Sequence, residues 1–73
     1  MTIQEIQERV DEIAKFTKAA SGAHASEVAV EMEDNLRTDF IAHVRDNPDD
    51  PELRAKAVIV LSTDDMNFAR WCA

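Results

Sequence analysis

Three residues interrupt this 73-residue chain, and their positions limit its fold more than any other feature. They are Gly22, the single glycine, and Pro48 and Pro51, the two prolines. Glycine and proline are the strongest local breakers of regular structure, so the segments between them are free to run as long elements. A chain of this length forms one domain. We therefore predict a single helical domain over residues 1–73. We expect an all-α small bundle. It has two long antiparallel helices, at about 3–21 and 24–46, and two short C-terminal helices, at about 51–61 and 64–72.

The first segment carries a heptad pattern. Thr2 and Glu5 fit a capping box, in which a threonine hydroxyl accepts from a free backbone N–H at the start of a helix. A seam then recurs at alternating spacings of three and four: Ile3, Ile6, Val10, Ile13, Thr17 and Ala20. Gly22 follows where a helix commonly ends. Two arrangements fit this seam. It packs on the next helix of its own chain, or it pairs with its copy in a second chain.

The second segment has a stripe of apolar residues in steps of four: Val28, Met32, Leu36, Phe40 and Val44, widened by Ala25, Ala29 and Ile41. A strict step of four drifts slowly around a helix, so this face suits packing against two neighbours. Pro48 ends the helix, because the residue before a proline is pushed out of helical geometry.

The third segment opens with a strong helix start, Asp50-Pro51-Glu52. Its expected apolar face is Leu53, Ala57, Val58 and Leu61. The β-prone run at 58–60 is assigned to the helix because the chain has no second strand candidate. Residues 62–65 are interpreted as a break and a new cap. The last helix then carries Met66, Phe68, Ala69, Trp71 and Cys72.

The chain is acidic, with fifteen acids against eight bases and a net charge of −7. This balance disfavours direct binding to nucleic acid or to anionic membranes, which needs a basic surface. It fits solubility or a basic partner. No stretch approaches the roughly 20 apolar residues of a membrane span, and the N-terminus has no signal-peptide pattern. A single cysteine, Cys72, fits a reducing compartment, so we expect a cytoplasmic protein.

Two groups of side chains have the chemistry of metal ligands: His24 with Glu27 and Glu31, and Asp39 with His43 and Asp46. Carboxylate-bridged centres in helical bundles need Glu-x-x-His on two helices, and this sequence has none. No base is placed near Cys72, and no glycine-rich loop is present. We therefore predict no enzyme, no cofactor and no metal, and keep a metal-binding bundle using His24 or His43 as an alternative.

Two surfaces are candidates for binding. Glu27, Glu31, Glu33 and Asp34 form an acidic stripe that is able to imitate nucleic-acid phosphates, or that is simply a solvated helix face. Near the C-terminus, Phe68, Arg70 and Trp71 supply residue types favoured at interfaces. Trp71 equally suits folding back to close a small core.

The segment Asp65-Met66-Asn67-Phe68-Ala69-Arg70-Trp71-Cys72-Ala73 follows an Asn-Pro-Asp-Asp-Pro-Glu loop and a short Ala-rich helix. It resembles small uncharacterised proteins of actinobacterial phages over about the last third of the chain. The Phe-x-Arg-Trp-Cys-Ala tail is the most specific part. The resemblance implies no activity, cofactor or catalytic residue. It implies a small protein in a bacterial host cytoplasm, where many such products bind a host protein.

Together these patterns predict a non-enzymatic protein–protein interaction module. We expect it to bind a protein partner or itself, with a homodimer favoured. The expected contact residues are Ile3, Ile6, Val10, Ile13, Phe68, Arg70 and Trp71. The first alternative is an acidic decoy that occupies a DNA- or RNA-binding protein through the acidic stripe. The second is the metal-binding bundle.

Overall fold

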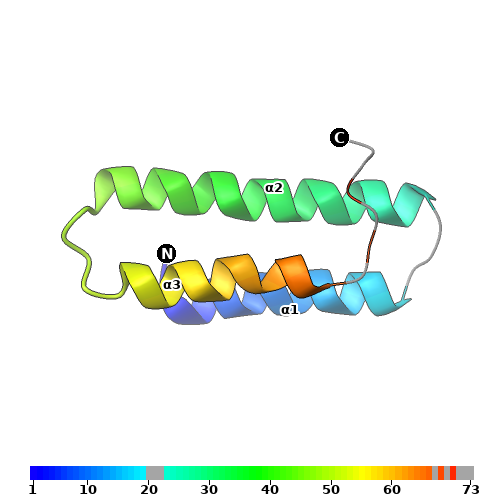
Figure 1. Ribbon diagram of the computed structural model, residues 1–73, viewed down its shortest axis with the longest axis horizontal. Coiled ribbons are helices and arrows are strands. Elements are labelled where there is room, and N and C mark those ends of the chain that lie inside the picture. Colours follow the sequence, from blue (N-terminus) through cyan, green and yellow to red (C-terminus); the bar gives the residue numbers. More distant parts are fainter. Residues whose placement is uncertain (20–22, 67, 69, 71–73) are drawn as a thin grey trace.

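The structure is a computed structural model that describes residues 1–19, 23–66, 68 and 70. These residues form α1 (Ile3–Ala19), α2 (Ala23–Asp46), α3 (Leu53–Leu61) and the short 3-10 helix η1 (Ser62–Asp65), with no strand among them. Figure 1 shows α2 along one side, antiparallel to α1 and α3, with α3 in front of α1. The predicted all-α bundle is confirmed. The predicted end of the first helix at Gly22 lies outside the described residues.

The start of α1 is capped as the sequence predicts. The backbone N–H of Glu5 donates to the Thr2 hydroxyl at 3.1 Å, and the N–H of Ile6 donates to the Thr2 carbonyl at 3.1 Å. Thr2 therefore satisfies one of the N–H groups that a helix start leaves without a partner.

The core lies where the three helices meet. Five buried residues form it: Ile6, Val10 and Ile13 from α1, Leu36 from α2 and Val60 from α3. Partly buried side chains pack against this cluster, among them Phe40, Ile59 and Phe68. Of the two arrangements left open for the seam of the first helix, the structure has the one within the chain.

The third helix begins at Leu53, two residues later than the predicted start at residue 51. A carboxylate oxygen of Asp50 accepts from the N–H of Glu52 at 2.9 Å, and the Asp50 carbonyl accepts from the N–H of Leu53 at 3.4 Å. Pro51 and Glu52 are thereby held in a turn that leads into α3.

The predicted apolar face of α3 was wrong. Lys56, Val60 and the following Thr63 are buried, whereas Val58 and Leu61 are 65% and 55% exposed. The sequence is apolar on every side of this helix, so hydrophobicity alone did not identify the inward side. A polar contact does: the Lys56 amine forms an ion pair with Asp50 in the α2–α3 loop.

The predicted final helix at 64–72 was also wrong over its described part. The chain passes from α3 directly into η1, and Met66 then takes an extended conformation with φ −77° and ψ 140°. Neither Phe68 nor Arg70 is helical. Arg70 lies beside α2, where it contacts Glu33. Ala69, Trp71 and Cys72 lie outside the described residues.

Among the helices of the described residues, none combines the length and the apolarity needed to cross a membrane.

Candidate interaction surface

An apolar hollow of about 210 Å³ lies between α2 and α3. We call it the α2–α3 groove. Its lining residues are Arg37, Phe40 and Ile41 from α2 with Ala57, Val60 and Leu61 from α3. Ile41 is 68% exposed, and it is one of the exposed large hydrophobic residues of the described chain, together with Val58 and Leu61. Two of these three side chains line the groove, and the third lies on the same short helix.

The groove follows from the sequence of α3. This helix carries apolar residues on all sides, and a helix of that kind is normally covered all round. Here α1 and α2 cover the side that bears Val60. Val58 and Leu61 point away from that side and stay mostly exposed.

The charges beside the groove differ from those of the whole chain. Five charged residues lie three or four positions along the chain from Ile41, Val58 or Leu61, and they are Arg37, Arg45, Arg54, Asp64 and Asp65. Three bases and two acids give this surround a net charge of +1. Because the whole chain carries −7, all its other residues together carry −8. Arg37 pairs with Asp64 across one end of the groove. The surround of the groove is therefore less acidic than the protein as a whole.

The predicted contact residue Arg70 is engaged within the chain. Its Nε and one Nη donate to the two carboxylate oxygens of Glu33 at 3.0 and 3.2 Å, and it also donates to the carbonyls of Thr63 and Met66. Its guanidinium carbon lies 3.9 Å from the centre of the Phe68 ring. Phe68 and Arg70 thus hold the C-terminal segment on the bundle. Trp71 lies outside the described residues.

The electrostatics of Glu33 fit this pairing. Burial by itself raises the pKa of a carboxyl group, but the hydrogen bonds of Arg70 and Thr63 and the charges of Arg37 and Arg70 outweigh it. The pKa of Glu33 therefore lies below its ordinary value, and the side chain is an ionised carboxylate although only 2% of it is exposed.

Only three of the four residues predicted to form the acidic stripe are exposed in the structure. Glu27, Glu31 and Asp34 are exposed, whereas Glu33 points into the protein and binds Arg70. The structure therefore leaves three carboxylates on that face of α2, which thins the surface that a decoy of a nucleic-acid-binding protein requires.

A buried polar cluster closes the end of the bundle at the α2–α3 loop. His43 Nε2 lies 2.8 Å from an Asp50 carboxylate oxygen, and the same oxygen accepts from Lys56, which is 4% exposed. Hydrogen bonds from Lys56, from the backbone of Glu52 and from His43 hold the pKa of Asp50 far below its ordinary value. This cluster fixes the loop and the start of α3.

The cluster does not match the ligand groups expected for a metal. Asp39 pairs with Arg9, Asp46 pairs with Arg45, and His43 turns to Asp50. Within the described ranges, no three His, Cys, Asp or Glu side chains come close enough together to hold an ion. The side chain of His24 lies outside what is described.

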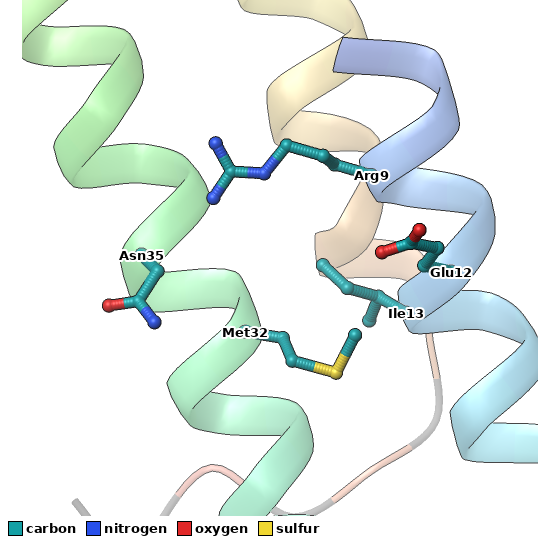
Figure 2. A pocket seen from close by; sticks show the side chains of 5 residues that line it. All are labelled: Arg9, Glu12, Ile13, Met32 and Asn35. Carbon is teal, nitrogen blue, oxygen red and sulfur yellow. The ribbon is translucent and has the colours of Figure 1, made fainter. Parts of the chain in front are cut away.

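A second hollow, of about 150 Å³, lies between α1 and α2 and is lined by Arg9, Glu12, Ile13, Met32 and Asn35. Figure 2 shows Arg9 extending from α1 toward α2, and the Met32 side chain extending from α2 toward Ile13. The Arg9 guanidinium is held by Asp39 at 2.8 Å. This hollow is small and mixed in polarity, so the α2–α3 groove is the better candidate site.

Comparison of the chain with protein-family models, with curated proteins and with solved structures finds no match. The candidate site therefore rests on geometry. Sequence reasoning placed Val58 and Leu61 on a buried face and Ile41 at the edge of one, so it missed the groove. The sequence feature that could have indicated the groove is the presence of apolar residues on all sides of α3.

Proposed function

We propose that this chain is a non-enzymatic protein-interaction module, and that its binding surface is the α2–α3 groove. The observation that supports this proposal is the exposed second apolar side of α3. Large apolar side chains at Ile41, Val58 and Leu61 stay in water on a small, highly charged protein, which has a cost that contact with a partner removes.

The shape of the groove indicates the kind of partner. A groove between two helices accepts a third helix, whose apolar residues at i, i+3, i+4 and i+7 enter it. Ile41 and Leu61 stand on opposite walls and would contact such a helix from both sides. We therefore propose a partner that presents an apolar helical face.

A pull-down with matched variants tests the proposal. Wild-type protein, Leu61→Glu and Ala55→Glu are used as baits in an actinobacterial lysate treated with nuclease, which the resemblance to phage proteins makes the first choice. Leu61 lines the groove, whereas Ala55 is exposed on the same helix and is not among its lining residues, so both variants add one negative charge to α3. We expect proteins that bind wild type and Ala55→Glu but not Leu61→Glu, or self-association with the same dependence.

Binding that is equal for all three baits would count against the groove. Capture of a nucleic-acid-binding protein that is lost as salt rises, and that ignores Leu61→Glu, would instead favour the acidic decoy acting through Glu27, Glu31 and Asp34. If neither foreign protein nor self-association depends on position 61, the proposed function is overturned.

A further inference from the structure

We infer that the partner in the α2–α3 groove is a second copy of this chain, seated groove against groove. This inference rests on the proposed function, since it names the occupant of the same surface. Three properties of the described residues support it: the area of the face, the charges around the groove and the arrangement of its two walls.

The face is large enough. A stable interface of ordinary size covers about 800 Å² on each partner. The accessible surface of the chain is 4933 Å², so such an interface would take about one sixth of it. The two longer axes of the molecule measure 41 and 21 Å, and Figure 1 looks onto the broad face that they span, with α2 and α3 in view and α1 behind. One broad face therefore supplies the required area.

The charges permit self-contact at this face and oppose it elsewhere. The surround of the groove carries +1 and the other residues carry −8, so two copies that meet through other surfaces bring like charges together. Groove-to-groove contact places two regions of low net charge against each other. A strongly basic partner would gain little electrostatic attraction at the groove, because three arginines lie beside it: Arg37, Arg45 and Arg54.

The two walls are complementary to each other. A two-fold axis that runs along the groove sets α2 of one copy opposite α3 of the other. Ile41 then faces the apolar wall that carries Leu61 of the second copy, and Arg37 faces the acidic end that carries Asp64 of the second copy. Because each contact occurs twice, the two exposed apolar residues that line the groove, Ile41 and Leu61, give a four-residue apolar centre.

Analytical ultracentrifugation over a concentration series, in about 0.05 M and about 0.5 M NaCl, tests the inference. We expect a monomer–dimer equilibrium for wild type. The dimer should be tighter at the higher salt, because salt screens the repulsion between two chains of net charge −7.

Three variants locate the contact. Leu61→Glu and Ile41→Glu should each weaken the dimer about 30-fold or more, as loss of a central interface residue does. Ala55→Glu, with the same added charge on an exposed position outside the groove lining, should stay close to wild type. Far-ultraviolet circular dichroism checks that each variant is folded, and Leu61→Ser or Ile41→Ser replaces a glutamate variant that is not.

Two outcomes overturn the inference. One is a wild-type chain that stays monomeric up to about 1 mM, where any dimer is weaker than about −4 kcal/mol. The other is a dimer that Leu61→Glu and Ile41→Glu leave unchanged. If the chain is monomeric and the pull-down shows a foreign protein that depends on Leu61, the second copy is excluded and the proposed function stands. If neither is seen, both fail.

Discussion

Arg70 and Glu33, 37 positions apart in the sequence, form a two-point ion pair that fastens the C-terminal segment to α2. The two hydrogen bonds, at 3.0 and 3.2 Å, use the fixed fork of the guanidinium. Because Glu33 is buried, its charge depends on Arg70 and Arg37 for compensation. The pair therefore holds Arg70 against α2.

Substitution of Arg70 should destabilise the fold. Arg70→Ala leaves a buried carboxylate with less compensation, so we expect a loss of roughly 2–4 kcal/mol in the free energy of unfolding. Arg70→Lys should recover only part of it, because lysine lacks the planar fork. Urea unfolding followed by circular dichroism measures both. Arg45→Ala is the control: Arg45 and Asp46 form a pair in which both side chains are mostly exposed, and such pairs contribute about 0–1 kcal/mol. Equal losses for Arg70→Ala and Arg45→Ala would contradict the role of the buried pair.

Acid should unfold the protein through two carboxylates. The folded-state pKa values of Glu33 and Asp50 lie below their ordinary values of 4.5 and 3.8, so both groups stabilise the fold most when ionised. Their contribution is fully present above these ordinary values and is lost as the pH falls toward the folded-state pKa. We expect unfolding midpoints in urea to decline below about pH 4.5. Asp50→Asn should lower the neutral-pH stability and flatten the acid decline, and two parallel curves would refute this assignment.

The contrast between core and groove is testable with two isoleucines. Ile13→Ala opens a cavity in the core and should cost about 2–4 kcal/mol. Ile41→Ala removes a mostly exposed side chain and should stay within about 0.5 kcal/mol in dilute solution. Urea unfolding at low protein concentration compares them. A large cost for Ile41→Ala under those conditions would mean that this side chain is packed within its own chain.

The helix cap at Thr2 offers a fourth measurement. Thr2→Ala removes the hydroxyl that accepts from the N–H of Glu5, and we expect a loss of about 1 kcal/mol. The matched control is Thr38→Ala, an exposed position inside α2, where alanine is the better helix former and stability should hold or rise slightly. The thermal midpoints of the two variants should therefore move apart.

The sequence predicted α1 and its part of the core well, because one apolar stripe at helical period leaves one inward face. Ile6, Val10 and Ile13 lie where their spacing places them. The same reasoning was wrong for α3, where apolar residues surround the helix and the inward positions include Lys56. In such a segment the apolar residues are not confined to one face, so their periodicity does not identify the inward side.

Glu33 and Arg70 show a second limit. An acidic residue between other acids is expected on the surface, and an arginine beside aromatics is expected at an interface. In the structure these two residues instead pair with each other, although they are 37 positions apart in the sequence. A single sequence does not reveal such a pairing. The predicted final helix was wrong for a related reason, because nothing in the sequence indicated that Met66 would be extended and that Arg70 would contact Glu33.

We expect the ion pair between Lys56 and Asp50 also to set the rotation of α3 about its own axis. Each residue step turns a helix by about 100°, so a helix with apolar side chains all round has several rotational settings of similar packing energy. Leucine at position 56 would free α3 to roll, bury Leu61 and erase one wall of the groove. Lysine at this position therefore contributes to fold specificity, and through it to the exposed face, more than to stability.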